Sequence, residues 1–437
     1  MDVISPQPRQ HARRVTLPRT LLLPLFFITY SLAYLDRANY GFGAAAGMAH
    51  TLGITEQRTA LLGALFFAGY FAFQIPGMLL ARRLSASRLV LIALLLWGAL
   101  ATLTGIVHNF FWLCLIRLGL GIAESAIFPA MLLLVTRWFT RTERSRANSI
   151  LMLGNPVTVL WMSAITGFLI QRLGWQLTFV VEGLPAIAWA FVWGTLVRDS
   201  PRQARWMNPG EAVELEEQIT NPNLSPVAYP KQPATLLAIL LRGDTLLLSL
   251  QYFFWSVGVY GFVLWLPTIV RHGAALSMSA TGLLAAVPYI MGIAGELGIG
   301  YLADRTGRIY TLIWPFLLVA GFAMFGSFIF ADRSFPVAFT CLVLACGAMY
   351  APYPPFFSII PDRVPREWTG EVFALVNSAG ALGGFAGSYL IGALRAATGS
   401  DRTGDLLMCI TFVVSSILTI VIARMPVNSA TLEAQHT

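Results

Sequence analysis

Gly300-Tyr-Leu-Ala-Asp304-Arg305-Thr-Gly307-Arg308 follows one long apolar run of this sequence, and a weaker copy of the same pattern follows another. The copy is Gly77-Met-Leu-Leu-Ala81-Arg82-Arg83-Leu-Ser85, which keeps the first glycine and the arginine after the small or acidic position. It has Ala81 where the first stretch has Asp304. Because the two stretches occupy matching places, they indicate an internal duplication, a feature of membrane proteins built from two similar halves.

Apolar runs of the length of a membrane span recur along the whole chain. Of the 437 residues, 57% are hydrophobic and only 11% are charged, and the mean hydropathy is +0.69. The sequence therefore indicates an all-α polytopic membrane protein. At about 20 apolar residues per crossing, we expect twelve transmembrane helices with approximate limits 20–48, 59–81, 88–107, 111–136, 146–171, 176–198, 244–270, 279–303, 309–330, 336–360, 368–395 and 404–424.

The twelve expected spans form two groups of six, separated by a longer polar stretch. Together with the repeat, this grouping predicts two pseudo-symmetric six-helix bundles. The linker begins with an acidic, helix-compatible piece at 211–217 and becomes rich in Pro and Asn at 221–233, which favours a flexible tether. The expected organisation is an N-terminal tail at 1–19, a first bundle at 20–198, a linker at 199–243, a second bundle at 244–424 and a C-terminal tail at 425–437.

Basic residues gather on one side of the expected spans. Of the 29 Lys and Arg residues, 21 lie in the tails and in the loops on the same side, six lie in the opposite loops, and Arg37 and Arg117 lie inside spans. The positive-inside rule then predicts that both termini are cytoplasmic. The net charge of +8 follows from this topology. We expect no nucleic-acid partner, because the sequence offers no soluble basic face.

Four ionisable residues stand inside the expected spans: Asp36, Arg37, Arg117 and Glu124. A charge at the centre of a bilayer helix costs roughly 2.5–3.5 kcal/mol on insertion scales, so these residues are candidates for function and for pairing with one another. Arg117 and Glu124 are two helical turns apart, which places them on one face, about 10 Å apart along the axis. Apolar neighbours favour the neutral form of Glu124, whereas Arg37 favours the ionised form of Asp36. The alternative is that each pair is a static ion pair that holds two helices together.

Several stretches together resemble the major facilitator superfamily, and in particular its anion:cation symporter branch of hexonate, tartrate and aromatic-acid permeases. The stretch at 300–308 is similar to the cytoplasmic signature of the superfamily. The branch landmarks run in order along nearly the whole chain: Tyr34-Leu-Asp36-Arg37-Ala-Asn39, Arg117-Leu-Gly-Leu-Gly-Ile-Ala-Glu124, Trp138-Phe139 before Glu143-Arg144, Glu182-Gly-Leu-Pro185, Asp199-Ser-Pro201, and Tyr260-Gly-Phe-Val-Leu-Trp265-Leu-Pro267.

The resemblance implies roles for the four charges. In the similar family the pair that corresponds to Asp36 and Arg37 is ionic, and spans 1 and 4 line the central cavity. Protonation of Asp36 would then release Arg37, whose planar fork can bind a carboxylate bidentately. Arg117 would be either a second guanidinium on the path of the anion or the partner of Glu124. Asp36 and Glu124 are the candidate proton carriers.

The other candidate ligands are neutral. The resemblance implies that Tyr34 and Tyr70 flank the charges and that Asn155 supplies an amide. Spans 7–12 carry no deeply placed Lys or Arg, so we expect the second half to recognise the uncharged body of a substrate. Its candidate contacts are Gln251, Tyr260, Trp265, Tyr350, Tyr353, Ser378 and Asn377. For each aromatic residue, packing against lipid or a neighbouring helix is the alternative.

Charged residues at the cytoplasmic ends of the spans are candidate gate residues. They are Asp304, Arg305, Arg308, Glu143 and Arg144. The first three can form a charge cluster between helices that opens and closes with an inner gate. Glu296 is either a gate contact or an interfacial acid. Glu182 belongs to a family landmark, and the sequence assigns it no role.

These features favour a secondary transporter over other membrane proteins. A membrane enzyme is disfavoured because the spans contain no His-Glu-x-x-His, no Gly-x-Ser-x-Gly and no Cys/His cluster. A receptor is disfavoured because the tails and linker are too short for a signalling domain. We expect no metal and no cofactor.

The expected activity is proton-coupled uptake of a small organic anion by alternating access. A sugar acid such as a hexonate or a uronate fits the hydroxyl-bearing and amide-bearing candidates, and an aromatic or dicarboxylic acid is the alternative. Export of organic compounds is a further alternative, which Arg37 and Arg117 disfavour because they would repel cations. The expected setting is a monomer in the inner membrane of a bacterium.

Overall fold

The computed structural model describes residues 21–220, 236–364, 368–400 and 402–425. Within these ranges the regular elements are all helices. The predicted N-terminal tail, the Pro- and Asn-rich part of the linker and the C-terminal tail after residue 425 lie outside the described residues.

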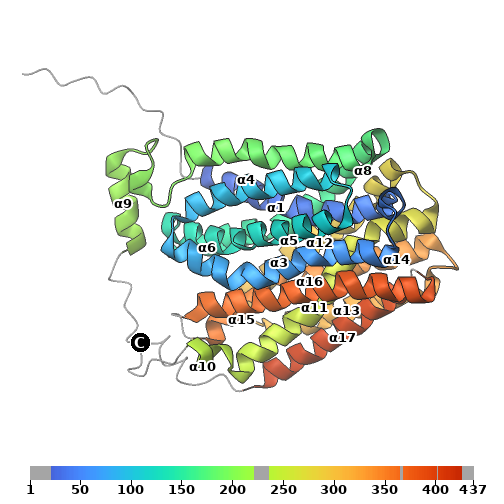
Figure 1. Cartoon of the computed structure of the whole chain (residues 1–437). Helices are drawn as coiled ribbons and strands as arrows, with labels where there is room; N and C mark the ends of the chain where they lie inside the picture. Colours follow the sequence, from blue (N-terminus) through green and yellow to red (C-terminus); the bar gives the residue numbers. More distant parts are fainter. Residues whose placement is uncertain (1–20, 221–235, 365–367, 401, 426–437) are drawn as a thin grey trace, which may run out of the picture.

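The helices of the first half pack side by side in one bundle (Figure 1). They are α1 (Leu22–Ala45), α2 (Met48–Leu52), α3 (Glu56–Arg83), α4 (Ala86–Ile106), α5 (Phe110–Ser125), α6 (Ile127–Trp138), α7 (Arg141–Met152) and α8 (Gly154–Leu196). A short turn of helix at Pro201–Gln203 and the helix α9 (Pro209–Thr220) follow, and α9 confirms the helix predicted for the acidic start of the linker.

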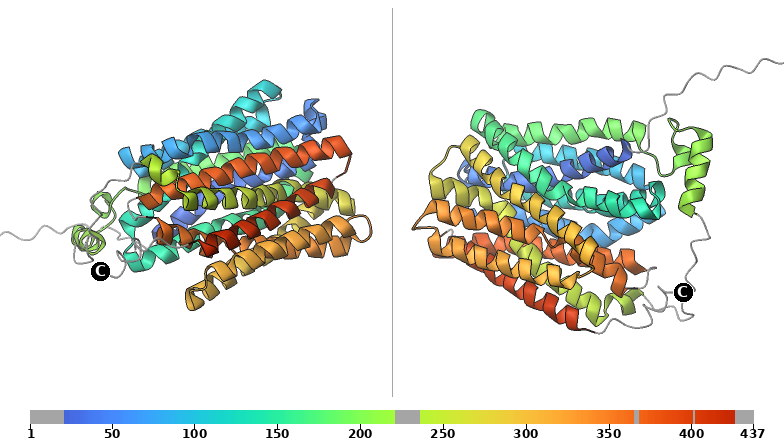
Figure 2. Two further views of the ribbon diagram at one scale, coloured as in Figure 1. Left: turned by 90° about the horizontal axis from the view of Figure 1, so that it is seen from below. Right: turned by 180° about the vertical axis from the view of Figure 1, so that it is seen from behind.

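The second half repeats the arrangement. Its helices are α10 (Leu236–Leu240), α11 (Gly243–Ala274), α12 (Met278–Thr306), α13 (Trp314–Phe330), α14 (Phe335–Tyr350), α15 (Tyr353–Arg363), α16 (Thr369–Thr398) and α17 (Arg402–Arg424), with a short turn of helix at Tyr310–Leu312. The two bundles meet where α16 packs along α3, α12 along α8 and α11 along α1 (Figure 2).

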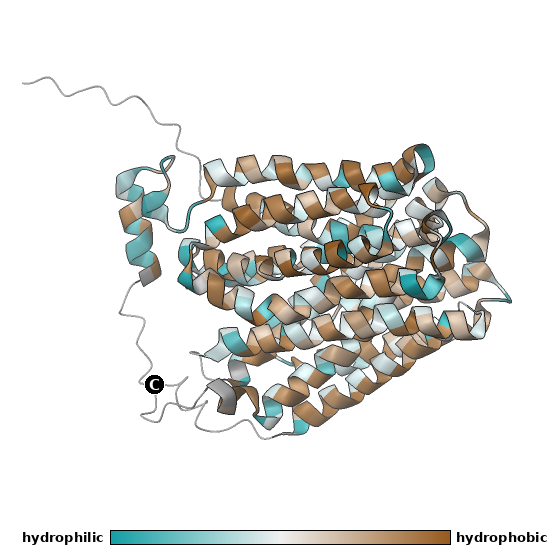
Figure 3. Ribbon diagram, viewed as in Figure 1, coloured by the Kyte–Doolittle hydropathy of each residue, from teal (hydrophilic) through white to brown (hydrophobic). Residues whose placement is uncertain are grey.

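The described helices account for the twelve predicted spans. Ten of them are long and apolar enough to cross a membrane. One, at residues 146–196, contains two crossings, because the chain reverses at Gly174, whose φ of 77° glycine adopts at little cost. The remaining crossing is α1, a continuous helix whose apolar sequence contains Asp36 and Arg37. Hydrophobic residues run along the helices and hydrophilic ones gather at their ends and on α9 (Figure 3).

Three predicted spans are each divided into two helices: the fifth breaks at Leu153 between α7 and α8, and two others break at matching places in the halves. The fourth breaks at Ala126 between α5 and α6, and the tenth breaks between α14 and α15. Proline explains both breaks, because it has no N–H to donate to the carbonyl four residues earlier. Pro129 lies just after the first break, and Pro354 and Pro355 lie just after the second. The sequence did not predict these breaks, since proline is tolerated in membrane helices.

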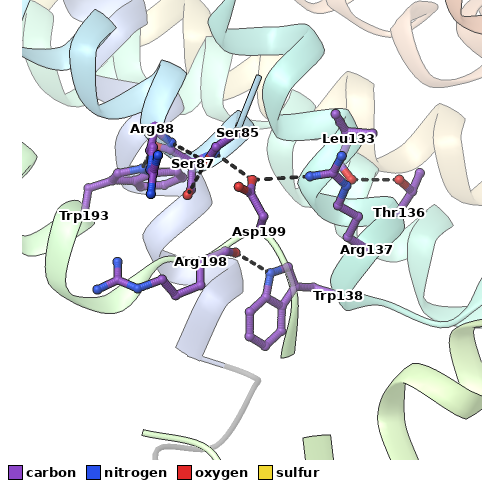
Figure 4. A network of polar contacts seen from close by, with 10 residues as sticks. All are labelled: Ser85, Ser87, Arg88, Leu133, Thr136, Arg137, Trp138, Trp193, Arg198 and Asp199. Atoms are coloured by element: carbon purple, nitrogen blue, oxygen red, sulfur yellow. Dashed lines mark hydrogen bonds and ion pairs between the residues drawn. The ribbon is translucent and has the colours of Figure 1, made fainter. Parts of the chain in front are cut away.

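The start of the linker is fixed to the first bundle (Figure 4). A carboxylate oxygen of Asp199 accepts a hydrogen bond from the backbone N–H of Ser87 at 3.0 Å and pairs with Arg137 at 3.3 Å, which joins the ends of α4, α6 and α8. The Trp138 ring stacks on Trp206, with ring centroids 5.7 Å apart, and its N–H donates to the Arg198 carbonyl at 2.8 Å. These contacts lie within the first bundle and fix its linker end as one unit.

A close approach of α5 to α3 depends on Gly121. A Cβ atom at this position would lie 1.9 Å from the backbone oxygen of Phe66. We therefore expect Gly121→Ala to push the two helices apart and to lower the stability of the protein by about 1–3 kcal/mol, as overpacking usually does. Thermal unfolding of the purified protein measures the change.

The matched control is Gly119→Ala on the same helix. There the nearest atom to a new Cβ is Cδ1 of Leu100, at 3.3 Å, and this flexible side chain can move aside. Equal unfolding temperatures for the Gly121→Ala and Gly119→Ala variants would contradict the close approach.

Candidate functional site

The centre of the first bundle contains a buried ion pair between α1 and α5. Nε of Arg37 donates to Oε2 of Glu124 at 2.9 Å. Glu124 is 0% exposed and Arg37 is 8% exposed. The other carboxylate oxygen of Glu124 has no hydrogen-bond partner in the described part of the chain. A buried pair of this kind costs much desolvation and adds little stability by itself, which favours a functional reason for it.

The predicted pairing of Arg37 with Asp36 is wrong. Consecutive residues of a helix point about 100° apart and do not face each other, so Arg37 turns toward α5. Asp36 is 3% exposed, and its Oδ1 has no hydrogen-bond partner among the described residues. Its electrostatic neighbours are Glu124, Glu182 and Arg117. The carboxylate that holds Arg37 is therefore Glu124, and Asp36 lies beside the pair.

Arg117 is buried on the same helix face as Glu124 but makes no ion pair with a described residue. Its Nε donates to the backbone oxygen of Leu62 at 3.2 Å. The guanidinium lies 4.4 Å from the centre of the Tyr40 ring and 5.5 Å from that of Phe66, so aromatic faces stabilise the cation. Arg117 thus keeps most of its donors available.

Aromatic rings surround the Arg37 guanidinium. As predicted, Tyr34 and Tyr70 flank it, with ring centres 5.6 Å and 4.5 Å from its central carbon. Phe66 of α3 adds a third ring at 5.4 Å. From the second bundle, the Tyr260 ring lies tilted against Phe67, with ring centroids 4.6 Å apart, and Tyr260 interacts electrostatically with Arg37. The cation therefore lies where the two bundles meet.

Glu182 makes hydrogen bonds to two other helical segments, which the sequence did not predict. Its Oε2 accepts a hydrogen bond from the Asn39 amide at 3.0 Å, and its Oε1 accepts one from the Thr166 hydroxyl at 2.5 Å. These bonds join α1 to both crossings of α8. Asn39 lies three residues after Asp36, so Glu182 fixes the part of α1 that carries the site.

Two of the predicted second-half contacts are engaged within their own bundle. The Gln251 amide donates to the Thr419 hydroxyl of α17 at 3.2 Å, so it faces away from the first bundle. The indole N–H of Trp265 donates to the Ser388 carbonyl at 3.4 Å, and Arg395 lies over its ring at 5.3 Å. The sequence could not show which way Gln251 and Trp265 face. A buried span is apolar on all sides, so its pattern does not indicate how the helix is rotated in the bundle.

A ligand-binding role for the other predicted contacts stays a prediction. Tyr353 belongs to a ring cluster in which its centroid is 4.5 Å from Trp255 and 5.6 Å from Tyr350. The Asn155 side-chain oxygen has no partner in the described structure. Asn377 is half-buried on α16.

Two tyrosines of the second bundle are buried close to each other, and of these Tyr350 was among the predicted contacts of the second half, whereas Tyr289 was not. Tyr289 and Tyr350 are at most 1% exposed, and their hydroxyls have no hydrogen-bond partner among the described residues. Both interact electrostatically with Tyr34, which also lies against Arg37. Burying a hydroxyl without a hydrogen-bond partner costs about 1–3 kcal/mol of stability. A ligand or a water that bonded to these hydroxyls would remove this cost.

A cavity of about 940 Å³ lies between the bundles at the linker end. It is lined by the linker-end parts of α3, α6, α7, α12, α15 and α16. At the opposite end the bundles are joined by hydrogen bonds from the Gln57 amide to the Tyr389 hydroxyl at 3.0 Å and from the Met278 N–H to the Gln171 side chain at 2.9 Å. Arg271 also donates to the Ala45 carbonyl. The conformation is therefore open at the linker end and closed at the other.

The predicted gate residues lie at the linker end of their helices. Glu143 forms a capping box with Thr140 at the start of α7, and Arg144 donates to the Phe139 and Thr136 carbonyls. Asp304 is exposed at the cavity wall, Arg305 lies over the Tyr301 ring, and Arg308 is exposed. A gating role for these residues stays a prediction.

Two helical bundles around a buried charged centre, with a cavity open at one end, define a membrane carrier of the alternating-access class. The family model described as Major Facilitator Superfamily matches residues 26–388. The chain belongs to this superfamily, whose members are transporters and not enzymes. This confirms the superfamily predicted from the 300–308 stretch.

The comparisons with known proteins cover almost the whole chain. A protein of Agrobacterium vitis provisionally named a tartrate transporter is 29% identical, over 94% of this chain and 94% of its own. A quinolone resistance transporter of Acinetobacter baumannii is 30% identical, over 92% and 93%. A solved bacterial homologue of the human lysosomal transporter Spinster, in an inward-facing and unoccupied conformation, has a TM-score of 0.70 at 18% identity, over 95% and 97%, and shares the fold.

Proposed function

We propose that this protein takes up a small organic anion together with protons across the inner membrane of a bacterium. The observation that carries the proposal is the buried Arg37–Glu124 pair, in which a carboxylate of the protein already occupies the guanidinium that a substrate carboxylate would need. The carboxylate of Glu124 and the carboxylate of the substrate compete for the guanidinium of Arg37. This competition couples anion binding to the protonation of Glu124.

The cycle follows from this competition. Protonation of Glu124 removes its charge and releases the Arg37 fork, which can then bind the anion through two parallel hydrogen bonds. Arg117, with free donors nearby, adds positive potential on the path of the anion. When the site opens at the linker end, loss of the proton restores the ion pair and expels the anion. Asp36, buried beside the pair, is the candidate for a second proton.

The direction of transport follows from the charge carried. An anion of charge −1 that enters with two protons moves one net positive charge inward, which is worth about 2.3 kcal/mol per 100 mV. Both the membrane potential and the proton gradient then drive accumulation. The predominance of arginine at the linker end supports a cytoplasmic location for this end and for both termini. We expect the protein to act as a monomer.

The test of this proposal is uptake of labelled organic acids into vesicles that contain the purified protein. An imposed proton gradient, acidic outside, should raise the initial rate and drive accumulation. Uptake that is equally fast and equally concentrative without the gradient would contradict proton coupling.

The favoured substrate is a hydroxylated carboxylate such as a sugar acid. The support is the pair of buried hydroxyls of Tyr289 and Tyr350, which have no hydrogen-bond partner among the described residues and interact electrostatically with Tyr34, the tyrosine that lies against Arg37. A site built to hydrogen-bond a hydroxyl rejects an analogue that lacks it, because its own polar groups are then left unpaired. The name of the Agrobacterium relative refers to tartrate, a hydroxylated acid, and agrees with this substrate class.

Tyr289→Phe and Tyr350→Phe test the substrate class. Each is expected to reduce the preference for a hydroxylated acid over its deoxy analogue by roughly fivefold to tenfold, the value of one hydrogen bond. Competition against uptake of a labelled sugar acid measures the preference. The control is Tyr310→Phe, which removes a hydroxyl that bonds to Arg363 outside the site. An unchanged preference in both site variants would favour the aromatic acid instead.

A further inference from the structure

The cavity at the linker end contains two buried polar side chains that the proposed anion transport does not use. Gln74 of α3 lines one wall, and Glu296 of α12 lines the wall formed by the second bundle. They are 1% and 3% exposed as whole residues. Both belong to apolar helices, and both reach the same space of about 940 Å³, which is the size of pocket that binds small molecules.

Neither side chain has a partner within the described structure. Both the nitrogen and the oxygen of the Gln74 amide lack a hydrogen bond. Glu296 has no ion pair and no hydrogen bond with a described residue, in contrast to Glu124 and Glu182, which are both bonded. A buried carboxylate without a counter-charge is costly, and a cationic ligand or a proton removes that cost.

The cavity wall beside these groups is aromatic. Phe373 of α16 stacks between Phe128 of α6 and Phe357 of α15, with ring centroids 5.9 Å and 4.7 Å apart and planes within 30° and 23° of parallel. All three residues line the cavity. Aromatic faces attract planar apolar groups and cations, and an anion gains nothing from them.

The anion site lies apart from this wall. Arg37 and Arg117 do not line the cavity, and the charged side chains that are described there, Glu296 and Asp304, are both acidic. The described charges of this cavity therefore favour the binding of a cation over the binding of an anion. The acids and aromatic rings instead match a flat apolar molecule that carries an ammonium group.

We propose that Glu296, Gln74 and the Phe128–Phe373–Phe357 stack form a second ligand site, which binds aromatic ammonium compounds from the linker end. The ammonium pairs with the Glu296 carboxylate, the Gln74 amide bonds a polar substituent, and the ring packs on the phenylalanines. The argument for this site does not rest on the proposed anion transport, although the anion would leave through the same cavity. It would give the protein the capacity to bind, and through alternating access to move, compounds of opposite charge to its anion.

The test uses dansylcadaverine, an aromatic probe with a primary ammonium, and dansylamide, which has the same ring system without it. Fluorescence titration of the purified full-length protein should show dansylcadaverine binding at least about tenfold more tightly than dansylamide, the value of one charge-assisted hydrogen bond. Glu296→Gln should remove this difference, and Gln74→Leu should weaken the binding of both probes. Asp304→Asn, which removes an exposed acid from the same cavity, should change dansylcadaverine affinity less than about twofold.

Each outcome decides the proposal. Equal affinity of the wild-type protein for the two probes would overturn it, and this comparison needs no variant to fold. Equal loss of affinity in Glu296→Gln and Asp304→Asn would also overturn it, because it would show a general effect of negative charge. Arg37→Lys should leave probe binding unchanged, so failure of the anion-transport proposal is distinguishable from failure of this one.

Discussion

Replacing Glu124 by glutamine is expected to abolish accumulation of the substrate while exchange of internal for external substrate continues. Glutamine keeps the size of the side chain but cannot bind or release a proton, so Arg37 stays available to the anion in every state. Each coupled charge at 100 mV is worth about 2.3 kcal/mol, or about a 50-fold concentration ratio. The variant loses this contribution, so the ratio of internal to external substrate should fall to about one. Uptake and counterflow of a labelled acid in vesicles measure the two activities separately.

The control for this prediction is Glu211→Gln. Glu211 is an exposed carboxylate on the linker helix α9, far from the site in the fold, and its loss should leave accumulation at the wild-type ratio. If Glu124→Gln still concentrates substrate against a gradient, Glu124 has a structural role and the proposed coupling is wrong.

Replacing Arg37 by lysine is expected to reduce uptake at low substrate concentration by roughly 10- to 100-fold. Lysine keeps the charge but loses the fork that binds a carboxylate through two hydrogen bonds, and a bond to a charged group is worth about 1.5–3 kcal/mol. The loss should appear as a higher substrate concentration for half-maximal uptake. Arg172→Lys, at an exposed arginine in the turn between the two crossings of α8, is the matched control and should leave uptake unchanged.

A more severe change separates binding from folding. Arg37→Ala leaves Glu124 buried without its partner, which typically costs about 3–5 kcal/mol of stability. Adding Glu124→Gln to Arg37→Ala removes the buried charge, so the double variant should regain stability without regaining uptake. Uptake by the double variant at the wild-type rate would show that Arg37 does not bind the anion.

The twelve spans could be predicted from the sequence, because the length of an apolar run and the arginines of the adjoining loops identify each span on its own. It did not predict the breaks between α5 and α6 and between α14 and α15, since a single proline permits either a kink or a break. The repeat between 77–85 and 300–308 shows in the fold as matching helices of the two bundles, although Ala81 replaces the acid of the second copy.

Within the site, the sequence identified the buried charges but not their pairing. Asp36 and Glu124 are equally conspicuous as charges in apolar runs, and the choice between them as partner of Arg37 depends on how α1 is rotated against α5. The same limit explains Gln251, whose amide faces α17. Gln74 could have been found by the criterion that found the charges, because an amide in an apolar span also needs a partner.

Competition between Glu124 and the anion for Arg37 is tested most directly by counting the protons that the protein takes up when it binds substrate. Purified protein in weakly buffered solution with an indicator dye is mixed with the sugar acid at a pH where the free protein holds Glu124 ionised. Binding should take up at least one proton per anion in the wild-type protein, through linkage, and about one proton fewer in Glu124→Gln. Binding of the anion to the wild-type protein without uptake of a proton would contradict the competition.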